Sequence, residues 1–90
     1  MGYTNVTVGS GSAVLLVSAN SLRLSLIIVN NGSSSIYIGD DPSVSTATGL
    51  VIGSGEKLQE DSGGQRTYLG NYYAISEDST NDIRYWERIR

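Results

Sequence analysis

Residues 21–42, SLRLSLIIVNNGSSSIYIGDDP, decide the fold class of this 90-residue chain. Successive side chains of an extended strand point to opposite faces, so residues 22–30 would present one purely aliphatic face. That face consists of Leu22, Leu24, Leu26 and Ile28. The opposite face carries Arg23, Ser25, Ile27 and Val29. We expect the aliphatic face to lie in the core, and the apolar end of the other face to be covered as well.

A polar turn follows this strand. Asn30, Asn31 and Gly32 tolerate positive φ, which favours a tight connection. The sequence therefore predicts a hairpin from residues 22–30 into the strand that contains IYI at 36–38. Together with a later strand, this arrangement predicts one buried layer with the following members: Leu24, Leu26, Ile28, Ile36, Ile38, Tyr73 and Ile75.

The rest of the chain repeats the same pattern of short β-rich runs between turns. Clusters of Gly, Ser, Asn and Asp recur about every six to ten positions, and no window carries an apolar helical period. The predicted strands cover residues 3–8, 13–18, 22–30, 34–39, 49–53, 56–60, 66–76 and 82–89. We predict an all-β fold, a small antiparallel β-sandwich or jelly-roll-like barrel of about eight short strands, in a single domain over residues 1–90.

The composition excludes several kinds of site. The chain has no Cys and no His, so it lacks thiolate ligands, disulfides and the commonest general base. Residues 1–83 hold three basic and eight acidic residues, whereas residues 84–90 hold three basic and one acidic. An acidic body argues against nucleic acid as a partner. No apolar run is long enough to span a membrane, and the N-terminus lacks a signal peptide, so we expect a soluble protein.

The remaining ionisable residues offer little catalytic chemistry. Lys57 is the only lysine, and Asp40 and Asp41 are sequence neighbours that would rarely converge on one substrate atom. We therefore expect no enzyme, no catalytic residue and no cofactor. A bound calcium ion stays open as a minor alternative, if the loop with Asp40 and Asp41 meets the acidic group Glu77, Asp78 and Asp82.

The closing strand has the composition that most clearly indicates a binding surface. Half of the six basic residues lie in the last seven positions, beside the sole tryptophan. Alternation places four of these side chains on one face: Arg84, Trp86, Arg88 and Arg90. Trp and Arg are enriched in binding hot spots, so we predict an inter-subunit or partner contact here, with carboxylates such as Asp40, Asp41, Glu60 or Asp61 of a neighbour. The alternative is a solvated edge strand whose charges only deter aggregation.

The order of motifs resembles a known class of proteins. VTVGSGSAVLLVSAN is followed by the quoted strand and turn, then by EKLQED, YYAIS and the closing strand, over roughly residues 5–86. This pattern is similar to that of the small β-sandwich structural proteins of tailed-bacteriophage virions. The resemblance implies a capsid decoration (cement) or head-fibre protein, made in the host cytoplasm and located on the head surface. Its implied partners are the major capsid protein, another virion protein, and further copies of itself.

Two other functions remain open from the sequence. One is a tail or baseplate component of the same kind of particle. The other is a carbohydrate- or receptor-binding module, since aromatic side chains on sandwich loops can hold sugars. The aromatic residues concerned are Tyr37, Tyr68, Tyr72 and Trp86.

Overall fold

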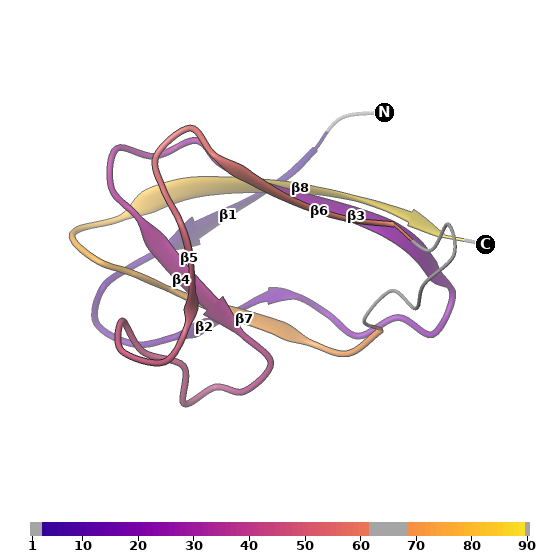
Figure 1. The fold of residues 1–90 in the computed structure, drawn as a ribbon, viewed down its shortest axis with the longest axis horizontal. Coiled ribbons are helices and arrows are strands. Elements are labelled where there is room, and N and C mark those ends of the chain that lie inside the picture. The colour runs from indigo at the N-terminus through magenta and orange to yellow at the C-terminus, as the bar shows by residue number, and fades with distance from the viewer. Residues whose placement is uncertain (1–2, 62–68, 90) are drawn as a thin grey trace.

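The computed structural model describes residues 3–61 and 69–89, which form two packed antiparallel sheets (Figure 1). One sheet has the strand order β1-β8-β3-β6 and the other has the order β2-β7-β4-β5. The strands are β1 (Thr4–Val8), β2 (Val14–Val17), β3 (Arg23–Asn30), β4 (Ile36–Gly39), β5 (Leu50–Ile52), β6 (Lys57–Asp61), β7 (Tyr72–Ser76) and β8 (Asn81–Ile89). The predicted all-β sandwich is confirmed.

The strand order is that of a jelly roll. Among the described residues, β4 and β5 are the only strands that follow each other in the chain and also pair. Every other connection between successive strands crosses from one sheet to the other. Most pairings therefore join segments far apart in sequence, such as β1 with β8 and β3 with β6. This arrangement leaves β1 and β6 at the edges of the first sheet, and β2 and β5 at the edges of the second.

The predicted core face of residues 22–30 is correct only in its second half. Leu26 and Ile28 are buried, but Leu22 is 48% exposed and Leu24 is partly exposed. The reason is an irregularity in the pairing with β8, where Arg23 lies opposite Ile89 and Ser25 already lies opposite Arg88. A bulge of this kind adds one residue to one strand and shifts the alternation of side chains. Arg23, predicted to face outward, is consequently buried.

The predicted orientation of β7 is wrong. Tyr72 and Ala74 are buried, whereas Tyr73 and Ile75 face the outside of the sheet and are partly exposed. Alternation alone defines two faces without saying which is inside, and both faces of this strand are apolar. The pairing decides the question, because Ala74 lies opposite the buried Ile38 of β4. On the other side of β7, a pairing irregularity in β2 turns both Leu16 and Val17 toward the core.

The predicted hairpin at Asn30-Asn31-Gly32 is also wrong, because β3 and β4 belong to different sheets. The segment instead carries the chain across the sandwich. Asn30 is fully buried, and its side-chain amide donates to the carbonyl oxygens of Ser34 and Ile52 at 2.8 and 3.0 Å. Its Oδ1 accepts from the amide of Gly32. A buried side chain of the first sheet that bonds backbone groups of the loop and of β5 in the second sheet stabilises this crossing.

Candidate docking faces

The closing strand β8 is a central strand for much of its length. Its first half pairs with β1, from Asn81 opposite Val8 to Tyr85 opposite Thr4, and it pairs with β3 from Ile83 onward. From Trp86 to Ile89, the described residues supply a partner on the β3 side alone. The predicted alternative of a solvated edge strand therefore applies, at most, to this C-terminal half.

The outer side chains of β8 lie in rows with those of β3 and β6. Residues paired across an antiparallel sheet share a face. Arg84 pairs with Val29, which pairs with Lys57, and Trp86 pairs with Ile27. We call the resulting surface the basic face: Lys57, Arg84, Arg88, Trp86, Ile27 and Val29. It contains every exposed Lys and Arg among residues 3–61 and 69–89, since the remaining basic residue there, Arg23, is buried.

The basic face has a partly exposed apolar centre and an exposed charged rim. Trp86, Ile27 and Val29 are partly exposed, whereas Lys57, Arg84 and Arg88 are exposed. The expectation that Ile27 and Val29 are covered on both sides is not met, because the described strands form only two layers. Two acidic positions share this surface. Arg84 Nε lies 3.2 Å from Asp82 Oδ2, and both side chains are exposed. Asp61 of β6 is in register with Ser25, which pairs with Arg88 on the other side. Arg88 and Lys57 form no ion pair with any of the side chains that the structure describes.

The structure brings three of the four predicted interface residues to one face and adds a residue that was not predicted. Arg84, Trp86 and Arg88 share one face, as expected from their alternation, and Arg90 lies outside the described residues. The sequence analysis missed Lys57. Its strand was predicted, but only the pairing of β6 with β3 places its side chain two strands away from Arg84.

The outer face of the second sheet has a different character. Tyr37 of β4 pairs with Val51 of β5 and with Ile75 of β7, and Leu15 of β2 pairs with Tyr73 of β7. These five side chains point away from the core and form what we call the apolar face. Leu15 and Val51, at its two edges, are 46% and 52% exposed, and the three central residues are partly exposed. None of the five carries a charge, although the exposed Glu77 follows just beyond the end of β7.

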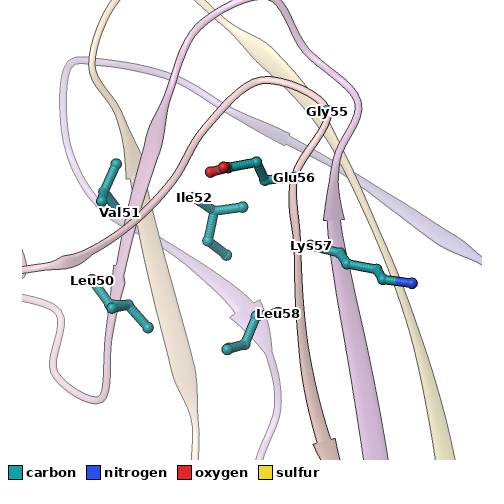
Figure 2. A pocket seen from close by; sticks show the side chains of 7 residues that line it. All are labelled: Leu50, Val51, Ile52, Gly55, Glu56, Lys57 and Leu58. Carbon is teal, nitrogen blue, oxygen red and sulfur yellow. The ribbon is translucent and has the colours of Figure 1, made fainter.

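A shallow groove runs along β5, where the edges of the two sheets separate (Figure 2). Its volume is about 620 Å³, and residues 50–52 and 55–58 line it. The side chains of Ile52 and Leu58 point toward each other across it, whereas Lys57 points away, toward the basic face. Glu56 closes the turn between the strands, because its Oε1 accepts a hydrogen bond of 2.7 Å from the amide of Gly53. The groove therefore offers apolar contact at Ile52 and Leu58, with the Glu56 carboxylate at its turn.

The acidic residues considered for calcium do not form a site. Within the described part of the chain, no three Asp or Glu side chains come together in a way that could hold a metal ion. Asp41 instead organises its own loop, accepting from the Ser43 amide at 2.8 Å. This hydrogen bond, with a second one from the Ser43 side chain, lowers the pKa of the exposed Asp41 carboxyl below its usual value.

The aromatic residues considered for sugar binding are spread over the molecule. Trp86 belongs to the basic face, Tyr37 belongs to the apolar face of the other sheet, and Tyr72 is buried. Tyr68 lies outside the described residues. Since stacking on a sugar needs aromatic rings on one accessible surface, this arrangement does not provide a platform from these residues.

Comparisons with known proteins add no relative: no family model, no curated protein and no solved structure matches this chain. In the described residues, no helix has the length and apolar character required to cross a membrane.

Proposed function

We propose that this chain is a structural accessory protein of a virion, which docks by its basic face on an acidic protein surface of the assembled head. The observation that carries the proposal is the gathering of Lys57, Arg84 and Arg88 around Trp86 on one sheet face. The motif order that resembles tailed-phage virion proteins supports the choice of particle. The jelly-roll strand order is compatible with it, since viral capsid proteins use this architecture among many others.

The docking chemistry follows from the centre and rim of the basic face. Trp86 is paired with Ile27 and is partly exposed, so a partner that covers it removes aromatic surface from water. Hot spots of this type contribute about 2 kcal/mol or more. The exposed cations contribute about 0–1 kcal/mol each when they pair with carboxylates, because water and salt screen them. Trp86 therefore supplies affinity, and the cations select an acidic partner and orient it.

The experiment is a binding assay on tailed-phage particles that carry this protein. Mass spectrometry of purified particles first tests its presence and gives its copy number. Particles depleted of it are then incubated with the wild type, Trp86→Ala, Arg88→Gln and Thr46→Glu, and sedimented. Thr46 is exposed in the loop between β4 and β5, and its variant changes the net charge by the same amount as Arg88→Gln.

We expect Trp86→Ala and Arg88→Gln to bind weakly and Thr46→Glu to bind as the wild type. Absence of the protein from particles, or equal binding of all four proteins, would refute the proposal. A low copy number would place the protein on the tail or baseplate instead of the head. Binding of single-stranded DNA or of glycans through Trp86, with no binding to particles, would assign the basic face to a different ligand.

A further inference from the structure

Asn31-Gly32, at the crossing between the two sheets, is the dipeptide of this chain that is chemically most open to deamidation. Asparagine is a thermolabile residue type, and Asn31 is the only asparagine in the sequence that glycine follows. Because glycine has no Cβ, its main-chain nitrogen is the least hindered in attacking the preceding side-chain amide. Yet position 32 requires a glycine, since a Cβ there would overlap the side chain of Asn81. The packing of the crossing therefore imposes a reactive dipeptide.

Deamidation at this dipeptide needs specific movements of the chain. The Gly32 nitrogen loses its proton to water and attacks Asn31 Cγ. The new N–Cγ bond closes a succinimide ring, the Cγ–Nδ2 bond breaks, and ammonia leaves. Water then opens the ring at either carbonyl, which leaves aspartate or isoaspartate at position 31. The nitrogen reaches Cγ only by rotation about ψ and χ1 of Asn31, the free rotations of its backbone and side chain.

Hydrogen bonds hold the groups that the reaction has to move. The Gly32 amide donates to Oδ1 of the buried Asn30 at 2.9 Å, and the Gly32 carbonyl accepts from Ser54 Oγ at 2.7 Å. The main-chain amide of Asn31 donates to the carbonyl oxygen of Asp82 at 3.0 Å, and its Nδ2 donates to Asp82 Oδ2 at 3.3 Å. Rotation that turns the Gly32 nitrogen toward Cγ breaks the first bond and leaves a buried acceptor on Asn30 unpaired, which is unfavourable.

We propose that Asn31 is a modification site that the folded chain keeps closed, and that it deamidates when the crossing at Asn30 opens. Asn30 cannot follow Gly32 outward, because its Nδ2 donates to the carbonyl oxygens of Ser34 and Ile52. Opening therefore breaks this local network without unfolding the core, as proteins open in units smaller than the whole domain. The inference is independent of the proposed function.

The modification is a permanent record of the opening. Deamidation removes the Nδ2 donor that Asn31 presents to Asp82 and leaves a carboxylate in its place. Two carboxylates at such a short separation disfavour each other's charge. Ring opening to isoaspartate also lengthens the main chain at position 31. A modified chain therefore cannot restore the original contacts of the crossing.

The experiment measures the rate of deamidation at Asn31 in the full chain, at mildly alkaline pH, by peptide mass spectrometry and enzymatic labelling of isoaspartate. It compares the native wild type with the wild type unfolded in urea. Ser54→Ala removes the hydroxyl that holds the Gly32 carbonyl. Its matched control is Ser10→Ala, since Ser10 is also an exposed serine and lies in the connection between β1 and β2.

Two further variants separate local from global opening. Asn30→Ala removes the acceptor of the Gly32 amide itself, and Ser54→Ala provides the test if this variant does not fold. Val17→Ala destabilises the core in β2, where Val17 is 1% exposed, and leaves the hydrogen bonds of the crossing in place. Urea denaturation measures the stability of every variant.

We expect Asn31 in the native wild type to deamidate at least about ten-fold more slowly than in urea, because only the open population reacts. Ser54→Ala should react about three-fold or more faster than the native wild type, and Asn30→Ala faster still, whereas Ser10→Ala and Val17→Ala should react as the wild type. A native rate within about two-fold of the rate in urea would overturn the inference, since the crossing would give no protection. So would a faster reaction in Val17→Ala than in Ser54→Ala, because deamidation would then follow global unfolding.

Discussion

Arg23 donates from its Nε to Glu87 Oε2 at 2.5 Å, and this buried ion pair joins β3 to β8 at one end of the core. The Arg23 side chain is 0% exposed, and that of Glu87 is 19% exposed. The guanidinium also donates to the carbonyl oxygens of Gly70 and Ser18, at 3.2 and 2.7 Å, and lies over the ring of Tyr72. A buried guanidinium is tolerated only where such partners surround it.

Replacing Glu87 by Gln should destabilise the protein by about 3–5 kcal/mol, because it leaves the buried charge of Arg23 without a counterion. The surface pair Arg84–Asp82 is the control, since Asp82→Asn should cost about 0–1 kcal/mol. Urea denaturation of the two variants and the wild type measures both losses. Equal losses would show that the Arg23–Glu87 pair is not buried as described.

The bulge in β3 predicts that alanine substitutions of Leu22 and Leu26 destabilise the protein unequally, although sequence alternation alone places both leucines on the same face. Leu26→Ala should cost about 2–5 kcal/mol, because Leu26 is 1% exposed within the core cluster. Leu22→Ala should cost about 0.5 kcal/mol or less, because Leu22 is 48% exposed. Thermal or chemical unfolding distinguishes them. A large loss at Leu22 would mean that the bulge is absent and that the simple alternation holds.

Gly32 lies against the side chain of the buried Asn81, and a Cβ at this position would come within 2.0 Å of Asn81 Oδ1. Asn81 donates to the hydroxyls of Ser34 and Ser76, both at 2.8 Å, so it cannot move without breaking this network. Gly32→Ala should therefore cost about 1–3 kcal/mol.

Gly11→Ala is the control for Gly32→Ala, because no atom lies within 4 Å of its added Cβ. It should leave the melting temperature nearly unchanged. If both variants melt at the wild-type temperature, the packing between Gly32 and Asn81 is looser than the structure indicates.

Alanine substitutions of Ile83 and Trp86 should differ in their cost in stability, because Ile83 lies on the core side of β8 and Trp86 on its outer side. Ile83→Ala should cost about 2–5 kcal/mol, since Ile83 is fully buried. Trp86→Ala should cost about 1 kcal/mol or less, because Trp86 lies on the outer face of β8, opposite Ile27, and is partly exposed. Guanidinium denaturation of both variants tests this. A loss of several kcal/mol at Trp86 would assign it to the core and remove it from the docking face.

Docking by the basic face should weaken as salt is added. Exposed charges are screened over about 10 Å at 0.1 M salt and over about 3 Å at 1 M. Particle binding by the wild type should therefore fall with ionic strength, and binding by Arg88→Gln should fall less steeply, because it has lost one of the exposed cations. Identical salt dependence of the two proteins would show that Arg88 takes no part in the contact.

The sequence alone determined the local properties of this chain. Turn residues and alternation predicted the eight strands and the all-β class, because both depend on neighbours within a few positions. They also identified Arg84, Trp86 and Arg88 as side chains of one face, and Leu26, Ile28, Ile36 and Ile38 as core residues. In these runs no irregularity interrupts the alternation between the residues concerned.

Tertiary structure decided which face is inside and which strands meet. The bulges in β3 and β2 shift the alternation, and they are defined only by the pairing with β8 and β7, more than fifty positions away in sequence. The phase of β7 depends on Ala74 lying opposite Ile38, since both of its faces are apolar. The crossing at Asn30 depends on the carbonyl groups of Ser34 in the loop and of Ile52 in the second sheet. Lys57 shares a face with Arg84 only through the pairing of both strands with β3. Each of these features rests on hydrogen bonds between segments that are distant in sequence. Local sequence patterns do not indicate which distant segments will pair.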